Sequence, residues 1–218
     1  MIAIVDYGVG NLFSLKSSFE AIGKEAVATA DETIIRNADR ILLPGVGAFK
    51  DAYLKLKESG LDKVLIECAG KGTPILGVCL GMQLLFDQSN EYGSCPGLGL
   101  IKGEITGLAG RISTELKVPH MGWNALQFTG KGQAEDGTAL GQEGVHDLFK
   151  YINEGDHVYF VHSFSAVGCS ESTIAVCEYG TDVIAAVAKG NVMGCQFHPE
   201  KSGDVGLKIL KAFCEMEK

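Results

Sequence analysis

The chain has 218 residues, of which 46% are hydrophobic, and it carries a formal net charge of −8. This length predicts a single domain over residues 1–218 with enough apolar residues for a buried core, and no apolar run is long enough to cross a membrane. The negative charge argues against nucleic acid and anionic membranes as partners, because both would repel the chain.

The first part of the chain alternates apolar runs with amphipathic stretches, the rhythm of β-α-β units in a parallel sheet. The first run begins without the basic segment of a signal peptide, so we expect a strand there and a cytoplasmic protein. Asn11 is the predicted N-cap of a helix that ends at Gly23. Further helices are predicted over 50–58 and 61–71, and the predicted strands are Ile2 to Asp6, Ala26 to Thr29, Arg40 to Leu43 and Pro74 to Val78.

The segment Gly77-Val78-Cys79-Leu80-Gly81 stands between a predicted strand and a helical stretch from Met82 to Phe86. Its two glycines allow the strained strand-to-helix turn of a nucleophile elbow, with Cys79 at the apex. The following helix N-terminus favours the thiolate of Cys79, and the N–H of Leu80 is free to stabilise an oxyanion. The chain has seven cysteines without paired spacing, so we expect the other six to be structural, with no disulfide framework and no zinc site.

From about residue 100 the pattern changes to short strands. The glycine- and charge-rich segment 129–143 predicts a mobile surface loop, and a short partner-binding insertion is the alternative. We therefore expect an α/β fold with an open, mostly parallel twisted sheet flanked by helices and an additional antiparallel β portion. The elements predicted in this part are strands over Trp123 to Phe128, His157 to Phe164, Ile174 to Glu178, Val183 to Ala188 and Val192 to Phe197, and a helix from Asp204 to Glu215.

A second segment, Gln196-Phe197-His198-Pro199-Glu200, contains the residues that a reactive thiol needs. A cysteine near neutral pH requires an imidazole partner, and the imidazole requires a carboxylate to fix its tautomer. Either motif alone is more often structural, but their combination predicts a catalytic triad of Cys79, His198 and Glu200.

Two glycine-rich turns are further candidates for function. Gly8-Val9-Gly10 has Phe13 where a dinucleotide site requires its third glycine, and the chain contains no phosphate-binding loop. Pro44-Gly45-Val46-Gly47 follows a predicted strand at the carboxyl edge of the sheet, where α/β proteins build their sites. This turn could supply the second N–H donor of an oxyanion hole, with a simple tight turn as the alternative. We expect neither a metal nor another cofactor.

The motifs GVCLG and QFHPE together resemble those of the class I glutamine amidotransferases, whose Cys-His-Glu triad hydrolyses the side-chain amide of glutamine and passes ammonia to a synthase partner. Within that family the chain is similar to the glutaminase subunits of imidazole glycerol phosphate synthase, through Ile4 to Asn11, Leu43 to Phe49 and Val118 to Asn124. The resemblance covers nearly the whole chain and implies a flavodoxin-like sheet. Residues 129–156 depart from it, because they are longer and more polar than expected.

The resemblance also implies roles for individual residues. It assigns Val46 and Gly47 to the oxyanion hole, together with the N–H of Leu80. As substrate contacts it suggests Gln83, Glu91, His162 and Ser163. Taken alone, Glu91 would more often be a solvated charge, and His162 could equally be a buried structural residue.

A partner is implied as well, namely a cyclase subunit with a (β/α)8 barrel. The residues expected to face it are Asn11, Met121, Trp123, Tyr159 and Lys201. Large apolar residues among turn formers often mark an interface, but core packing is an equal alternative for Met121 and Trp123.

Two other readings stay open. The first is a different enzyme on the same scaffold, either a glutaminase of pyridoxal phosphate, anthranilate or guanylate synthesis or a cysteine-elbow hydrolase. Against these, the segment from Pro119 to Asn124 favours the glutaminase subunit of imidazole glycerol phosphate synthase, which belongs to histidine biosynthesis. The second is a non-catalytic regulatory subunit, which an intact triad argues against.

Overall fold

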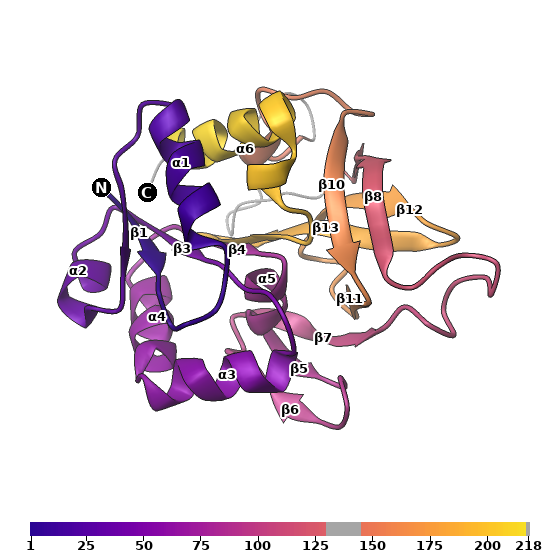
Figure 1. The fold of residues 1–218 in the computed structure, drawn as a ribbon, viewed down its shortest axis with the longest axis horizontal. Helices are drawn as coiled ribbons and strands as arrows, with labels where there is room; N and C mark the ends of the chain where they lie inside the picture. Colours follow the sequence, from indigo (N-terminus) through magenta and orange to yellow (C-terminus); the bar gives the residue numbers. More distant parts are fainter. Residues whose placement is uncertain (130–144, 217–218) are drawn as a thin grey trace.

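A computed structural model describes residues 1–129 and 145–216 of the chain. The loop predicted over 129–143 therefore lies outside the described residues, apart from Thr129. An eight-stranded sheet with the order β2-β1-β3-β4-β14-β13-β12-β9 forms the centre of the fold (Figure 1). Its strands are β1 Ile2–Val5, β2 Ala26–Thr29, β3 Arg40–Leu43, β4 Ile75–Val78, β9 Gln127–Phe128, β12 Thr173–Glu178, β13 Asp182–Lys189 and β14 Val192–Cys195.

The strands from β2 to β14 in this order are parallel, and those from β14 to β9 are antiparallel. The expected open, mostly parallel sheet with an antiparallel portion is confirmed. Strands β4 and β14 are neighbours in the sheet and run parallel, with Val78 opposite Cys195. This pairing brings the two motif-bearing segments side by side, although they are far apart in the sequence.

Helices cover both faces of the sheet (Figure 1). Ile2 and Ile4 of β1 pack into the core beneath α1 and α6, whereas Ala3 and Val5 belong to the core on the side of α2, α3 and α4. Because both faces are buried, the parallel strands are continuously apolar in sequence. The helices are α1 Leu12–Ala21, α2 Glu32–Arg36, α3 Phe49–Glu58, α4 Leu61–Gly70 and α6 Gly203–Glu215.

Several local predictions are confirmed, and one helix was missed. Asn11 caps α1 by accepting the Ser14 N–H at 3.4 Å, and Gly23 follows the end of that helix with φ +70°. Helix α2 was not predicted, because its few residues show too little periodicity. Among the described residues, no helix is both long enough and apolar enough to cross a membrane.

The helix predicted from Met82 to Phe86 is wrong at its end. Helix α5 comprises Leu80–Leu84, and Phe86 begins strand β5. The carbonyl groups of Leu84 and Leu85 accept hydrogen bonds from residues 98 and 100, so the chain leaves the helix to pair with that segment. A second sheet results, with the order β11-β7-β5-β6. Its strands are β5 Phe86–Ser89, β6 Cys95–Pro96, β7 Ile101–Gly107 and β11 Phe164–Val167.

A separate two-stranded ribbon consists of β8 (His120–Ala125) and β10 (His157–His162). The strand predicted over His157 to Phe164 is therefore interrupted at Ser163, where the chain passes from this ribbon to the second sheet. The strand predicted over Trp123 to Phe128 is likewise divided between β8 and β9. In Figure 1 the ribbon stands beside the antiparallel end of the main sheet.

Candidate active site

Cys79 stands in the sharp turn between β4 and α5, with φ +54° and ψ −111°. Such a positive φ is strained for a residue with a Cβ atom, and strain of this kind is concentrated at functional sites. The turn requires its glycines, because a Cβ on Gly81 would lie 1.9 Å from the Leu43 carbonyl oxygen and one on Gly77 only 2.7 Å from Gly81. The Cys79 N–H donates to the Cys195 carbonyl at 2.8 Å, which fixes the turn to β14.

His198 follows β14 and is held by hydrogen bonds of its backbone. Its N–H donates to the Tyr159 carbonyl at 2.9 Å, and its carbonyl accepts the Ser202 hydroxyl at 2.7 Å. Ser202 Oγ in turn accepts the Tyr159 N–H at 3.0 Å. His198 is thus attached to β10 as well as to the central sheet.

Glu200, in the short helix η2 (Pro199–Lys201), lies behind His198. Its Oε1 is 2.9 Å from His198 Nδ1, and the two side chains are 1% and 4% exposed. Since the carboxylate accepts the Nδ1 proton, Nε2 is the nitrogen that faces Cys79. Burial alone would lower the pKa of His198, but its interactions with Cys79 and Glu200 outweigh burial and raise the pKa from 6.5 to about 9. The imidazole is therefore protonated at neutral pH.

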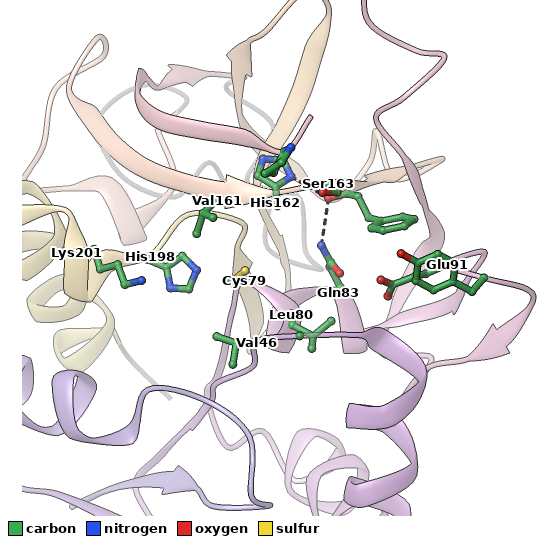
Figure 2. Close-up of a pocket in the computed structure, with 14 residues that line it drawn as sticks. Val46, Cys79, Leu80, Gln83, Glu91, Val161, His162, Ser163, His198 and Lys201 are labelled. Carbon is green, nitrogen blue, oxygen red and sulfur yellow. Dashed lines mark hydrogen bonds between the residues drawn. The ribbon is translucent and has the colours of Figure 1, made fainter. Parts of the chain in front are cut away.

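A cavity of about 420 Å³ opens in front of these residues. Figure 2 shows Cys79 between His198 on one side and Gln83 on the other, with Val46 and Leu80 beside it. The cavity brings together most of the residues predicted for the site, whereas Glu200, Asn11, Met121, Trp123 and Tyr159 are not part of its lining. The predicted residues that line it are Val46, Gly47, Cys79, Leu80, Gln83, Glu91, His162, Ser163, His198 and Lys201.

Glu91 is buried rather than a solvated surface charge. Its Oε2 accepts the Phe49 N–H at 2.6 Å, which caps helix α3, where the N-cap residue Ala48 offers no side-chain oxygen. This capping bond holds the carboxylate at the cavity wall, and the sequence did not predict it. Among the described residues no donor is bonded to Oε1, so this oxygen can accept from a ligand.

The side-chain amide of Gln83 is held by hydrogen bonds of its nitrogen, which leave the oxygen available in the lining of the cavity. Its Nε2 donates to the Phe164 carbonyl at 3.2 Å and to Gln196 Oε1 at 3.0 Å, the former bond being visible in Figure 2. Both amide protons are therefore used, and Oε1 remains as an acceptor. Together with Glu91 it gives the cavity two acceptors for a cationic group such as an ammonium.

His162 uses both ring nitrogens inside the protein. Nδ1 lies 2.8 Å from the Phe164 carbonyl, and Nε2 lies 3.0 Å from Nδ1 of His120, which the sequence analysis had not considered. Burial lowers the pKa of His162 to about 3 and that of His120 to about 4, so both rings are neutral. Only the ring face or the backbone of His162 is left for contact with a ligand.

The residues expected at a partner surface include two that are well exposed. Met121 is 60% and Trp123 is 52% exposed, so the alternative of core packing is wrong for both. The rings of Trp123 and Tyr159 lie 6.0 Å apart, and Lys201 Nζ lies 5.8 Å from the centre of the Tyr159 ring. Asn11 caps α1, which contacts η2.

The sequence predicted neither Gln196, although it belongs to the QFHPE motif, nor four residues of the cavity lining, namely Tyr92, Pro119, Val161 and Phe164. Gln196 is completely buried, and its Nε2 lies 3.7 Å from the sulfur of Cys79. A polar residue at the end of the apolar run Val192 to Phe197 was the available signal, because a buried amide must find partners. In the described part of the chain, no cluster of three or more His, Cys, Asp or Glu side chains could hold a metal ion.

Comparisons with known proteins agree with this geometry. Residues 3–216 match the sequence model of the family Glutamine amidotransferase class-I. The Oceanobacillus iheyensis protein "Imidazole glycerol phosphate synthase subunit HisH" is 46% identical over 99% of both chains, and the Lactococcus lactis protein of the same name is 45% identical over 98% of both. A solved structure described as "Crystal structure of glutamine amidotransferase" has a TM-score of 0.71 at 18% identity, covering 98% of this chain and 100% of that one.

We predict that the ring protons of His198 titrate with a midpoint near pH 9 in NMR spectra, and that Glu200→Gln moves this midpoint down by at least about one pH unit. In the Glu200→Gln variant, the side-chain amide at position 200 can still accept the Nδ1 hydrogen bond, but it has no negative charge to stabilise the imidazolium. His146, whose pKa burial lowers to about 4, is the internal control and should not move. An unchanged His198 midpoint in the variant would contradict the assignment.

The same shift predicts how stability depends on pH. The folded chain binds the His198 proton more tightly than the unfolded chain, so this contribution to the free energy of unfolding is complete below pH 6.5 and is lost as the pH rises through about 9. Chemical denaturation across this range should show a smaller loss for Glu200→Gln than for the wild type.

Proposed function

We propose that this chain, which belongs to the class I glutamine amidotransferase family, is the glutaminase subunit of an imidazole glycerol phosphate synthase. The observation that carries the proposal is the strained Cys79 in the lining of the cavity, facing a protonated His198 that Glu200 orients. The close relatives named above support the particular synthase.

The proposed reaction is an acyl transfer in two steps. The Cys79 thiolate attacks the side-chain amide carbon of glutamine, and His198 gives its proton to the departing ammonia. Neutral His198 then removes a proton from water, which hydrolyses the γ-glutamyl thioester and releases glutamate. Glu200 orients the imidazole throughout, and its buried carboxylate stabilises the imidazolium that is present before the first proton transfer and forms again in the second.

Stabilisation of the tetrahedral intermediates is assigned to backbone N–H groups. Leu80, immediately after the nucleophile, is the first residue of α5 and has no intrahelical acceptor for its N–H. Val46 and Gly47 line the same part of the cavity and are the source of the second donor.

Glutamine is held by its amino acid end. The carboxylate of Glu91 and Oε1 of Gln83 are the acceptors that we assign to its ammonium group. A substrate bound in this way directs its side-chain amide towards Cys79, which lies between Gln83 and His198 (Figure 2). Ser163 and the backbone of His162 complete the wall.

The partner in this proposal is a cyclase subunit with a (β/α)8 barrel, joined to this chain in a cytoplasmic heterodimer. There ammonia and a phosphoribulosyl aminoimidazole carboxamide nucleotide give imidazole glycerol phosphate and an aminoimidazole carboxamide ribotide, a lyase step that we assign to the cyclase. A covered channel is required, because ammonia that escapes into neutral water is lost as ammonium. Exposed Met121 and Trp123, with Tyr159, Lys201 and Asn11, are the surface that we assign to this partner.

The nitrogen source separates this function from others. In the complex with the cyclase, Cys79→Ala should abolish synthesis from glutamine but leave synthesis from added ammonia, because only the supply of ammonia is removed. Cys95→Ala, which removes a similarly buried sulfur from β6, is the matched control and should retain both activities. Glutamine hydrolysis that survives in Cys79→Ala would refute the assignment of the nucleophile.

The charge and the capping bond of Glu91 can be tested separately. Glu91→Gln keeps an oxygen for the Phe49 N–H, so we expect an unchanged melting temperature and a KM for glutamine that rises roughly ten-fold. Glu91→Ala should raise KM as well. It should also destabilise the fold, since the Phe49 N–H at the start of α3 loses its hydrogen-bond acceptor. If Glu91→Gln binds glutamine as the wild type does, the ammonium is held elsewhere.

The partner surface predicts a loss of affinity without a loss of stability. Trp123→Ala should weaken binding of the cyclase by about 2 kcal/mol in calorimetric titration, as expected for an aromatic anchor at an interface. Ile66→Ala removes an apolar side chain of comparable exposure, 44% against 52%, from helix α4 and should bind normally. Full affinity of Trp123→Ala together with a lowered melting temperature would exclude this surface.

A further inference from the structure

The sulfur of Cys79 has a second polar neighbour besides His198, on the strand that leads to the base. Gln196 is the residue after β14 and is 0% exposed. Its amide lies 3.7 Å from the sulfur at one end and 3.0 Å from Gln83 at the other. We propose that Gln196 is a positioning residue for the nucleophile, holding the Cys79 thiolate with an N–H donor.

The orientation of the Gln196 amide follows from a single carbonyl group. The Phe164 carbonyl can only accept, so the Gln83 atom 3.2 Å from it must be the nitrogen. The same Gln83 nitrogen lies 3.0 Å from one end of the Gln196 amide. Because that nitrogen is a donor, the Gln196 atom that it meets must be the oxygen, Oε1. The other end of Gln196, facing the sulfur, is then the NH₂ group and not the carbonyl.

The Phe164 carbonyl is itself fixed by a second donor. His162 Nδ1 lies 2.8 Å away and must carry a proton to bond to it. His162 Nε2 is then an acceptor, and His120 Nδ1 donates to it at 3.0 Å. Two donors, His162 Nδ1 and Gln83 Nε2, thus meet at the Phe164 carbonyl. From Gln83 the donation continues through Gln196 to the sulfur.

An N–H donor acts differently on the two forms of the thiol. A hydrogen bond to a charged acceptor is roughly twice as strong as one to a neutral acceptor, so the donor stabilises the thiolate relative to the thiol. Because the amide is buried and bonded at both ends, it also fixes the direction of the sulfur lone pair that it meets. Gln196 therefore contributes both to the amount of thiolate and to its aim at a substrate carbon.

This proposal rests on Cys79 being the nucleophile of the proposed function, but its test requires neither glutamine nor a partner. The probe is iodoacetamide, and alkylation of the Cys79 peptide is followed by mass spectrometry across a range of pH. In Gln196→Met, which keeps the volume but removes the donor, we expect the rate near neutral pH to fall on the order of ten-fold and the profile to move to higher pH. Gln196→Leu is the second variant and should behave alike.

The matched control is Asn191→Leu, at the opposite end of β14. The Asn191 amide donates to the carbonyls of Ala69 at 3.0 Å and Thr73 at 2.8 Å, so its loss should lower the melting temperature without changing the alkylation profile. Folded Gln196 variants that are alkylated like the wild type, or no more slowly than Asn191→Leu, would overturn the proposal.

A measurement on the wild-type protein keeps the test decisive if both variants fail to fold. The side-chain NH₂ resonances of Gln196 should titrate with the same midpoint as the alkylation profile of Cys79. Resonances that do not respond over that range would also overturn the proposal. A failure of glutamine hydrolysis alone, with these two results as expected, would instead count against the proposed function.

Discussion

The parallel pairing of β4 with β14 is the constraint on which the site depends. Val78 lies opposite Cys195, and the next residue, Cys79, donates its N–H to the Cys195 carbonyl at 2.8 Å. The ladder therefore fixes Cys79 to the strand that leads into Gln196 and His198. The elbow can close over this ladder only because Gly81 has no side chain where the Leu43 carbonyl oxygen lies. The geometry of the site is thus set at the centre of the sheet, where core strands are generally the last parts of a fold to open.

Buried histidines in neighbouring positions have opposite protonation states, and their partners explain the difference. His198 has a carboxylate on one nitrogen and a sulfur on the other, so its pKa is raised in spite of burial. Within the described part of the chain, the hydrogen-bond partners of the His162 and His120 rings are one carbonyl and each other, so burial lowers both pKa values. His198 is therefore protonated at neutral pH, whereas His162 and His120 are neutral rings, and His162 donates to the Phe164 carbonyl.

Much of this arrangement could be predicted from the sequence, and the omissions have physical reasons. The first and last residues of β2 and β3 were predicted correctly, because each strand is a short, mostly apolar run that ends at a clear change in the sequence. Cys79, His198 and Glu200 were singled out because each motif combines special backbone requirements with reactive side chains, and the structure brings the three side chains together. The extension of helix α5 to Phe86 was wrong, since hydrogen bonds to residues far along the chain override local periodicity. The roles of Gln196 and the capping bond of Glu91 depend on which atoms meet in space, and no spacing in the sequence encodes such contacts.

Tyr159 belongs to two parts of the molecule at once. Its ring contacts exposed Trp123 and lies beneath Lys201, while its backbone carbonyl and N–H hold the His198 segment. A protein seated on that ring would consequently act on the imidazole through a single residue. Thermodynamic linkage makes such coupling reciprocal. If the bound protein changes the affinity of the cavity for a ligand by some factor, the ligand changes the affinity for that protein by the same factor. Where that factor exceeds one, an occupied cavity would favour the assembled state, so that dissociation of the two subunits is most favourable after the product has left.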